Sequence, residues 1–382
     1  MNSRERVRTV LNGGVPDRVP LVIGVSNATG IKMKTYQAVK DLAGISEPDA
    51  YLYDWPELGT AAPGEAGLAR LRSDVRGVRD RFPARTYERN QNRAAHSDYI
   101  DSWGSGAKEI NPGDWFPGVH PLAGATSVDE IEAYDGWPDM DDPSRYAHVA
   151  ESASAIASRG EHAIMATPWL LFPLERAFAM QGMDTFLMNL AAYPDFAVAL
   201  LQKHLELCKK LMGHMLRALG DNVDIVKIGD DLGTQDNLMI SPGMYRELLL
   251  PIHADFVRFI KDNSAARVFF HTDGDVFDLI PDFIDMGVDI LNPIQTSAGR
   301  MSDLDRLKSE YGGQIVFCGA VDTHRILPNG SPDEVRAEVK RVIDILGRDG
   351  GYMAASVHTI MNDVPPRNVL AMVDAVEEFG WY

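Results

Sequence analysis

Two histidines near the carboxyl end of the chain each follow an apolar run that is typical of a buried β-strand. His271 ends the run 267–271, and His358 comes two residues after the run 352–356. Asp273 is two residues beyond His271, so both side chains share one face if the segment stays extended. Two imidazoles and a carboxylate can bind zinc and leave a fourth position open. His271, Asp273 and His358 are therefore the predicted metal ligands, the alternative being substrate contacts or acid–base groups without a metal.

Composition restricts the class of protein. A formal net charge of −18 over 382 residues repels phosphate backbones, which excludes nucleic acid as an expected partner. The two cysteines, Cys208 and Cys318, are too few for a disulfide framework or a thiolate-rich zinc site, and both are expected to be packing residues. No apolar run approaches the roughly 20 residues that span a bilayer, and the first residues lack the apolar stretch of a signal peptide. We expect a soluble, cytoplasmic protein that does not enter a membrane.

The fold prediction depends on eight strand-like runs with helical patterns between them. Most of these runs are continuously apolar, as expected for parallel strands that are covered on both sides. The pattern predicts one (β/α)8 barrel, a TIM barrel, in which the residues that follow the strands share one mouth. The eight runs are 18–23, 50–53, 163–167, 223–228, 267–271, 289–292, 315–318 and 352–356.

Residues 56–160 do not follow this alternation. The segment is rich in Asp, Gly, Pro and Trp, and it contains a capping box that begins at Ser127. We interpret it as an insertion after the second strand that folds over or beside the mouth as a lid. The chain 1–382 is thus predicted to be a single barrel domain, and a separate domain at 56–160 is the alternative.

Polar residues that come just after the predicted strands should line the mouth. Asp230 and Asp231 are adjacent, so one side chain faces inward while the other points elsewhere. We assign the pair a catalytic role, in binding a ligand or moving a proton, with helix capping as the alternative. Arg176 is suited to clamp a substrate carboxylate, although pairing with a neighbouring acid would also explain it. The predicted substrate-binding residues are Asn27, Trp169, Arg176, Asn292 and Gln295.

Several of these motifs together resemble the uroporphyrinogen decarboxylase superfamily. Within it, the sequence looks similar to the branch of zinc-dependent, corrinoid-linked methyltransferases. The resemblance covers nearly the whole chain and is weakest in 56–160. The motifs that carry it are Arg18-Val19-Pro20, Gly229-Asp230-Asp231-Leu232-Gly233, His271-Thr272-Asp273-Gly274, Leu291-Asn292-Pro293, Gly319-Ala320-Val321-Asp322-Thr323 and Gly350-Gly351-Tyr352.

Two departures from the family pattern shape the expected activity. The decarboxylases have an arginine-rich segment after the first strand, whereas residues 23–28 here contain no arginine to bind an anionic porphyrinogen. The thiol methyltransferases bind zinc through a His-X-Cys pair and a distant cysteine, whereas this chain has Asp273 and His358 at those places. Oxygen and nitrogen ligands make the metal a harder Lewis acid than thiolates do.

The resemblance therefore implies a methyltransferase that uses zinc to polarise a small methylated substrate, for instance an aryl methyl ether. The methyl acceptor would be a corrinoid, carried on a separate corrinoid protein, or tetrahydrofolate. The superfamily also suggests a homodimer. The alternative is a metal-independent decarboxylase or lyase in which Arg176 holds a small carboxylate, and a non-catalytic binding protein is the third interpretation.

Overall fold

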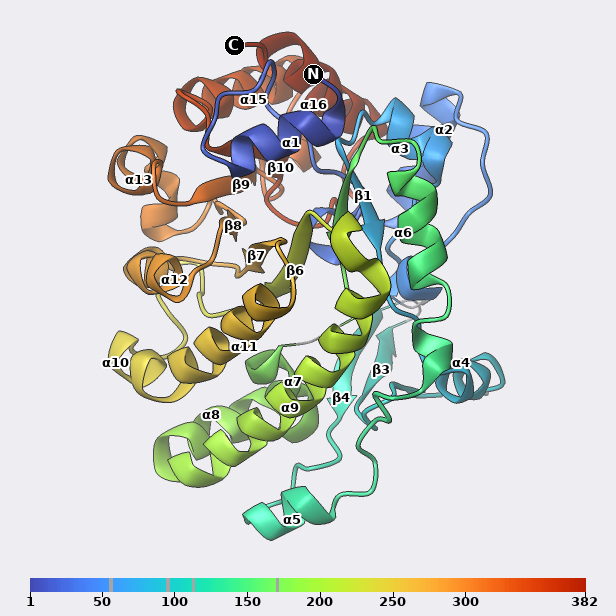
Figure 1. Cartoon of the computed structure of the whole chain (residues 1–382), viewed down its shortest axis with the longest axis vertical. Helices are drawn as coiled ribbons and strands as arrows, with labels where there is room; N and C mark the ends of the chain where they lie inside the picture. The colour runs from blue at the N-terminus through green and yellow to red at the C-terminus, as the bar shows by residue number, and fades with distance from the viewer. Residues whose placement is uncertain (55–57, 94–96, 112–113, 170–171) are drawn as a thin grey trace.

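Seven parallel strands form a curled sheet in a computed structural model that describes residues 1–54, 58–93, 97–111, 114–169 and 172–382. The order in the sheet follows the chain, β1-β5-β6-β7-β8-β9-β10. All strand carboxyl ends therefore meet at one edge of the sheet (Figure 1). The strands are β1 (Val75–Val78), β5 (Ala163–Ala166), β6 (Ile225–Gly229), β7 (Arg267–His271), β8 (Ile290–Asn292), β9 (Val316–Val321) and β10 (Tyr352–Ser356).

The extended segment 18–23 lies between the two edge strands of this sheet. Leu21 forms a parallel bridge with Ala354 of β10, and its carbonyl oxygen accepts a hydrogen bond from the backbone N–H of Asp74, 2.8 Å away, just before β1. The segment thus connects β10 to β1 through single contacts rather than a strand ladder. The predicted parallel α/β fold is confirmed, whereas the eight-stranded (β/α)8 barrel is found only as a seven-stranded sheet with this segment between its edges.

The predicted strand at 50–53 is wrong. Tyr51 forms an antiparallel bridge with Ala61, and Leu52–Asp54 is a short 3-10 helix in which Tyr53 has φ 59°. The strand after segment 18–23 is instead β1, within the range 56–160 that the sequence assigns to an insertion. A four-residue strand with Arg76 and Gly77 at its centre has no apolar run, which explains why it was missed.

The two faces of the strands pack against different partners. Side chains such as Ile225, Phe269 and Met353 point inward and form a cluster with Val7 and Val10 of α1 (Ser3–Leu11), which covers the amino ends of the strands (Figure 1). The outward-facing side chains pack against surrounding helices. Each fully buried aliphatic or aromatic side chain contributes roughly 1.5–3 kcal/mol.

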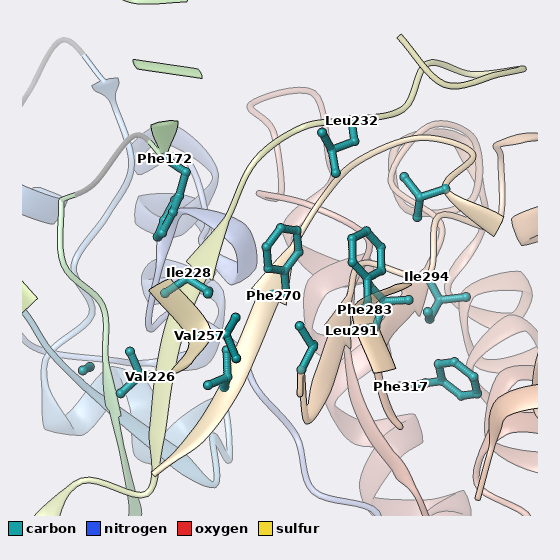
Figure 2. Close-up of a cluster of buried hydrophobic side chains, with 14 of the residues drawn as sticks. Phe172, Val226, Ile228, Leu232, Val257, Phe270, Phe283, Leu291, Ile294 and Phe317 are labelled. Atoms are coloured by element: carbon teal, nitrogen blue, oxygen red, sulfur yellow. The ribbon is translucent and has the colours of Figure 1, made fainter. Parts of the chain in front are cut away.

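Figure 2 shows the outward-facing layer. Val226 and Ile228 of β6 and Phe270 of β7 face Val257 of α11 and Phe283 of α12. Ser331 forms a capping box with Glu334 at the start of α15, and α16 begins at Pro366. The other helices around the sheet are α2 (Met33–Ala43), α3 (Glu65–Arg70), α7 (Pro173–Gln181), α8 (Met183–Ala192), α9 (Pro194–Leu219), α10 (Pro242–Met244), α11 (Leu250–Asn263), α12 (Ile280–Met286), α13 (Leu304–Tyr311), α14 (Ile326–Asn329), α15 (Pro332–Leu346) and α16 (Pro366–Phe379).

Aspartates at the amino ends of the strands share a structural role. Asp74, Asp224 and Asp289 each accept a hydrogen bond from the backbone N–H of a neighbouring strand, at Leu21, Ile164 and Val268. Each carboxylate also pairs with arginines; Asp74, for example, lies 2.7 Å from Arg6 and 3.2 Å from Arg18. Paired, hydrogen-bonded charges of this kind hold strand starts in register.

The chain between β1 and β5 carries additional elements. Its strands β2, β3 and β4 form a separate antiparallel sheet, which lies at the end of the molecule opposite α1 (Figure 1). The elements are α4 (Ala84–Gln91), β2 (Tyr99–Ile100), β3 (Gly106–Asn111), β4 (Asp114–Val119), α5 (Val128–Ala133) and α6 (Val149–Ala157). Across the described residues, no helix has the combination of length and apolar character that a membrane crossing requires.

Candidate metal site

The three predicted metal ligands converge at the carboxyl end of the sheet. His271 is the last residue of β7, Asp273 follows it, and His358 lies two residues beyond β10. One ligand atom from each residue lies within 4.8 Å of the others. The Asp273 oxygen Oδ2 is 3.9 Å from Nε2 of His271 and 3.7 Å from Nε2 of His358. Ligand atoms around a tetrahedral zinc ion are about 3.3 Å apart, so small side-chain rotations would bring these atoms to coordination distance.

Asn292 determines which nitrogen of His271 faces this cluster. Its amide nitrogen donates to the carbonyl oxygen of Cys318 at 3.2 Å, and its oxygen Oδ1 lies 2.7 Å from Nδ1 of His271. An amide oxygen only accepts hydrogen bonds, so Nδ1 carries the proton. Nε2 is left with a free lone pair directed at Asp273, as in a metal-binding histidine whose other nitrogen is held by a second residue. Asn292, which we predicted to bind substrate, is fully buried behind His271.

Backbone contacts fix the loop that carries Asp273. Asp231 accepts a hydrogen bond from the N–H of Asp273 at 2.9 Å, and the side-chain oxygen of Gln295 accepts one from Gly274 at 2.7 Å. Gly274 has φ +89°, and a Cβ there would lie 2.3 Å from the carbonyl carbon of Gly233. Only glycine allows the loops after β6 and β7 to meet backbone to backbone.

The surroundings shift the pKa of all three residues. Burial, with the nearby Asp231 carboxylate, raises the pKa of Asp273 to about 8. Burial lowers the pKa of His271 well below its ordinary value and lowers that of His358. Both imidazoles are therefore neutral near pH 7, the state in which they bind a metal, and Asp273 Oδ1 is buried without a hydrogen-bond partner. These residues fit a divalent cation, which would favour the ionised Asp273.

A cavity of about 260 Å³ opens beside the cluster, with Asp273 and His358 in its wall. Gln295, predicted to bind substrate, also lines it. The remaining polar lining was not predicted from the sequence, and it comes from the loops after β6, β9 and β10: Thr234, Gln235, Thr323, His324 and Thr359.

The adjacent aspartates point in different directions, as their adjacency predicts. Asp231 is half-buried and supports the Asp273 loop. Asp230 is fully buried, accepts hydrogen bonds from the N–H groups of Leu174 and Glu175 at the start of α7, and lies 2.8 Å from Nε2 of His253. The structure thus gives Asp230 the helix-capping contact that was the alternative to a catalytic role.

The other predicted substrate-binding residues lie outside the cavity lining. Arg176 is fully buried, pairs with Asp101 at 2.7 Å, and stacks on the Trp103 ring with 4.5 Å to its centroid. Trp169 packs against Tyr53, with ring centroids 4.7 Å apart. The carbonyl oxygen of Asn27 accepts a hydrogen bond from the Thr359 hydroxyl. Arg176 therefore anchors the segment between β1 and β5 through Asp101, while its Nε and Nη2 groups are buried without a hydrogen-bond partner.

Lys227 and Glu175 were missed by the sequence analysis. Lys227 lies in β6 and is only 6% exposed. Burial lowers its pKa, whereas the carboxylates of Glu175, Asp231 and Asp273 raise it. Burial, with Asp231 and Asp230 nearby, raises the pKa of Glu175 well above its ordinary value. A lysine within the apolar run Ile225-Val226-Lys227-Ile228 was the available indication.

The sequence matches one known protein family. A family model described as uroporphyrinogen decarboxylase (URO-D) matches residues 116–379. The uroporphyrinogen decarboxylase of Coxiella burnetii is 24% identical over 207 residues, which are 52% of this chain and 53% of that protein. The enzyme of Methylococcus capsulatus is 27% identical over 79 residues, 21% of this chain and 22% of that protein. The alignments thus span about a fifth to a half of these curated relatives.

Among solved structures, a methyltransferase from Methanosarcina mazei is similar over 99% of both chains. Its TM-score is 0.67 and its sequence identity is 19%. At this identity the likeness shows a shared fold.

Proposed function

Because the chain belongs to the uroporphyrinogen decarboxylase family, we propose that it is an enzyme of this family that transfers a methyl group. The donor would be a small methylated molecule, such as an aryl methyl ether. The acceptor would be a reduced corrinoid, delivered by a separate protein, or tetrahydrofolate. The methyltransferase from Methanosarcina mazei, which shares the fold, supports this choice within the family.

The observation that carries the proposal is the convergence of His271, Asp273 and His358 beside a polar cavity. These three residues would hold a zinc ion, and the cavity beside them provides space for a substrate. When bound there, the metal would withdraw electron density from the heteroatom that carries the methyl group.

The chain's own residues would prepare this reaction. Asn292 keeps the Nε2 lone pair of His271 directed at the cluster, and Asp231 fixes the backbone of Asp273. Gln235 and Gln295, both in the cavity wall, offer amide groups that would orient a bound ligand. Holding the reactants in one geometry would lower the entropic part of the activation free energy.

The structure gives less support to a metal-independent lyase. That alternative needs Arg176 to hold the substrate carboxylate, but the guanidinium is already paired with Asp101. Residues 23–28 also contain no arginine to bind a polyanionic porphyrinogen. Both observations favour methyl transfer over decarboxylation.

Metal analysis of enzyme purified without chelators tests the proposal. We expect about one zinc per chain, and His271→Ala and His358→Ala should each lose most of it while remaining folded. His324→Ala is the matched control, because His324 lines the same cavity but lies outside the cluster. Formation of a methylated corrinoid from a methyl aryl ether should require the metal. Full metal occupancy in both ligand variants, or metal-independent turnover, would refute the proposal.

A further inference from the structure

Lys227 faces the interior of the curled sheet, at the level just below the metal site. Lys227 and Ile225 are two residues apart in β6, so their side chains lie on the same face of the strand. Ile225 belongs to the inner cluster, whereas Val226 and Ile228 belong to the layer that faces the helices. The register partner of Lys227 on β7 is Phe269, two residues before His271. Phe269 and His271 are separated by two residues along the strand, a distance of about 6.6 Å. The long side chain of Lys227 can span this distance, so its ammonium group reaches the level of His271.

Lys227 differs from every other buried arginine or lysine that the structure describes. The arginines each have a carboxylate oxygen within 3.2 Å, as in the pairs that Arg145 and Arg176 form with Asp80 and Asp101. Lys227 has no carboxylate within 4.0 Å and no hydrogen bond within the described parts of the chain. A buried, unpaired charge is costly, and such a group commonly marks a site that a ligand completes.

The carboxylates nearest to Lys227 act on it only from a distance. Glu175, Asp231 and Asp273 contribute to its electrostatic surroundings, but none has an oxygen within 4.0 Å of the ammonium group. Among the described residues, the ammonium group therefore has no direct anionic partner.

We propose that Lys227 binds a carboxylate of the substrate, so that the methylated molecule is a small carboxylic acid. This inference depends on the function proposed above, because that function places the substrate at His271, Asp273 and His358. Lys227 thereby takes the role that the sequence predicted for Arg176. The ammonium would hold the acid group at the inner end, and the methylated heteroatom would lie at the metal site.

The test compares two ligands that differ only in charge, 4-methoxybenzoate and its neutral amide 4-methoxybenzamide. We expect calorimetry on the enzyme as purified to give a Kd about 10–100-fold lower for the acid, the gain expected from a charged hydrogen bond. Lys227→Met keeps the length and apolar stem of the side chain and should abolish this preference. A metal ion would favour the acid in both proteins, so the difference between them isolates the lysine.

Lys32→Met is the matched control. Lys32 is a half-buried cation whose ammonium already donates to the carbonyl oxygen of Leu58, and its loss should leave the preference intact. The melting temperature of Lys227→Met should stay equal or rise, because an unpaired buried charge is removed. If Lys227→Met does not fold, Lys227→Gln serves for the same measurement.

Wild-type enzyme that binds the acid no more tightly than the amide would overturn the proposal. The same applies if the Lys227 variant keeps the preference, or if Lys32→Met loses it equally. Failure of the methyl-transfer function is distinguishable, since it would appear as absent metal or absent methyl transfer with the Lys227-dependent preference unchanged.

Discussion

The two ends of the curled sheet are both rich in charge, but they use it differently. At the amino ends of the strands, Asp74 and Asp224 each accept a backbone hydrogen bond and pair with arginines. At the carboxyl ends, Lys227 has no hydrogen-bond or ion-pair partner among the residues that the structure describes, and one oxygen of Asp273 is buried without a hydrogen bond. Satisfied charges stabilise a fold, whereas unsatisfied ones are kept where a ligand completes them. The comparison separates the end that maintains the structure from the end where we propose that a ligand binds.

The largest effect should be a loss of stability on removing a carboxylate from the amino ends of the strands. Asp74→Ala leaves Arg6 and Arg18 without their shared carboxylate and Leu21 N–H without its acceptor. We expect the free energy of unfolding to fall by about 3–5 kcal/mol, the usual cost of removing one partner of a buried ion pair. Urea denaturation measures it. A loss below about 1 kcal/mol would show that this end is not the stabilising one.

At the carboxyl end, Asn292→Ala should weaken metal binding without a comparable loss of stability. The substitution removes the oxygen that keeps the proton on Nδ1 of His271. Loss of such a supporting contact lowers metal affinity or activity about 10–100-fold. Competition for zinc with a chelating dye gives the affinity, and unchanged affinity would contradict the role of Asn292.

Substitutions at Asp231 and Asp230 compare a site contact with a structural contact at two adjacent residues. Asp231→Asn removes a charge beside Asp273 and should lower turnover about tenfold, within the range for residues that support metal ligands. Asp230→Asn disturbs the start of α7 and His253, so we expect a loss of about 1–3 kcal/mol in stability with near-normal turnover. Equal turnover in both variants, measured with the same substrate, would remove the functional distinction.

The pH dependence of the metal-free protein tests the proton on Asp273. The folded-state pKa of Asp273 is about 8, above its unfolded value, so the folded state binds the extra proton. Its contribution to stability is therefore present at low pH and is lost as the pH rises toward 8. Asp273→Asn cannot ionise, so it should have a higher melting temperature than wild type at pH 9, and the two melting temperatures should converge at pH 4. Zinc affinity of the wild type should rise over the same interval.

Much of the fold and the metal cluster could be predicted from the sequence. Strands such as β7 and β10 are apolar runs that end beside His271 and His358. The apolar pattern predicts the strands, and the two histidines at their ends predict a cluster at the carboxyl edge of the sheet. By contrast, β1 contains Arg76, whose charge is neutralised by Glu65 at 2.6 Å, a contact between separate elements that no local pattern reveals.

The contacts of the site residues that the sequence could not reveal have a similar explanation. Arg176 finds its partner Asp101 75 residues earlier in the chain, and the ring of Trp103 covers the guanidinium. Asn292 is polar and follows an apolar run, but its position behind His271 depends on packing against Cys318. Lys227 was overlooked because a single charge in an apolar strand gives no hint of the face that it occupies until the register is known. Each case depends on contacts between segments far apart in the sequence.

The backbone contact between Gly233 and Gly274 has a consequence for motion. The loops after β6 and β7 carry Asp231 and Asp273, and at this contact there is no side chain that could act as a spacer between them. The two loops must therefore move as one rigid unit, and thermal fluctuation of either displaces both aspartates together. Their separation is preserved during such motion, and a ligand can enter without displacing either loop, because the cavity is open to the surface.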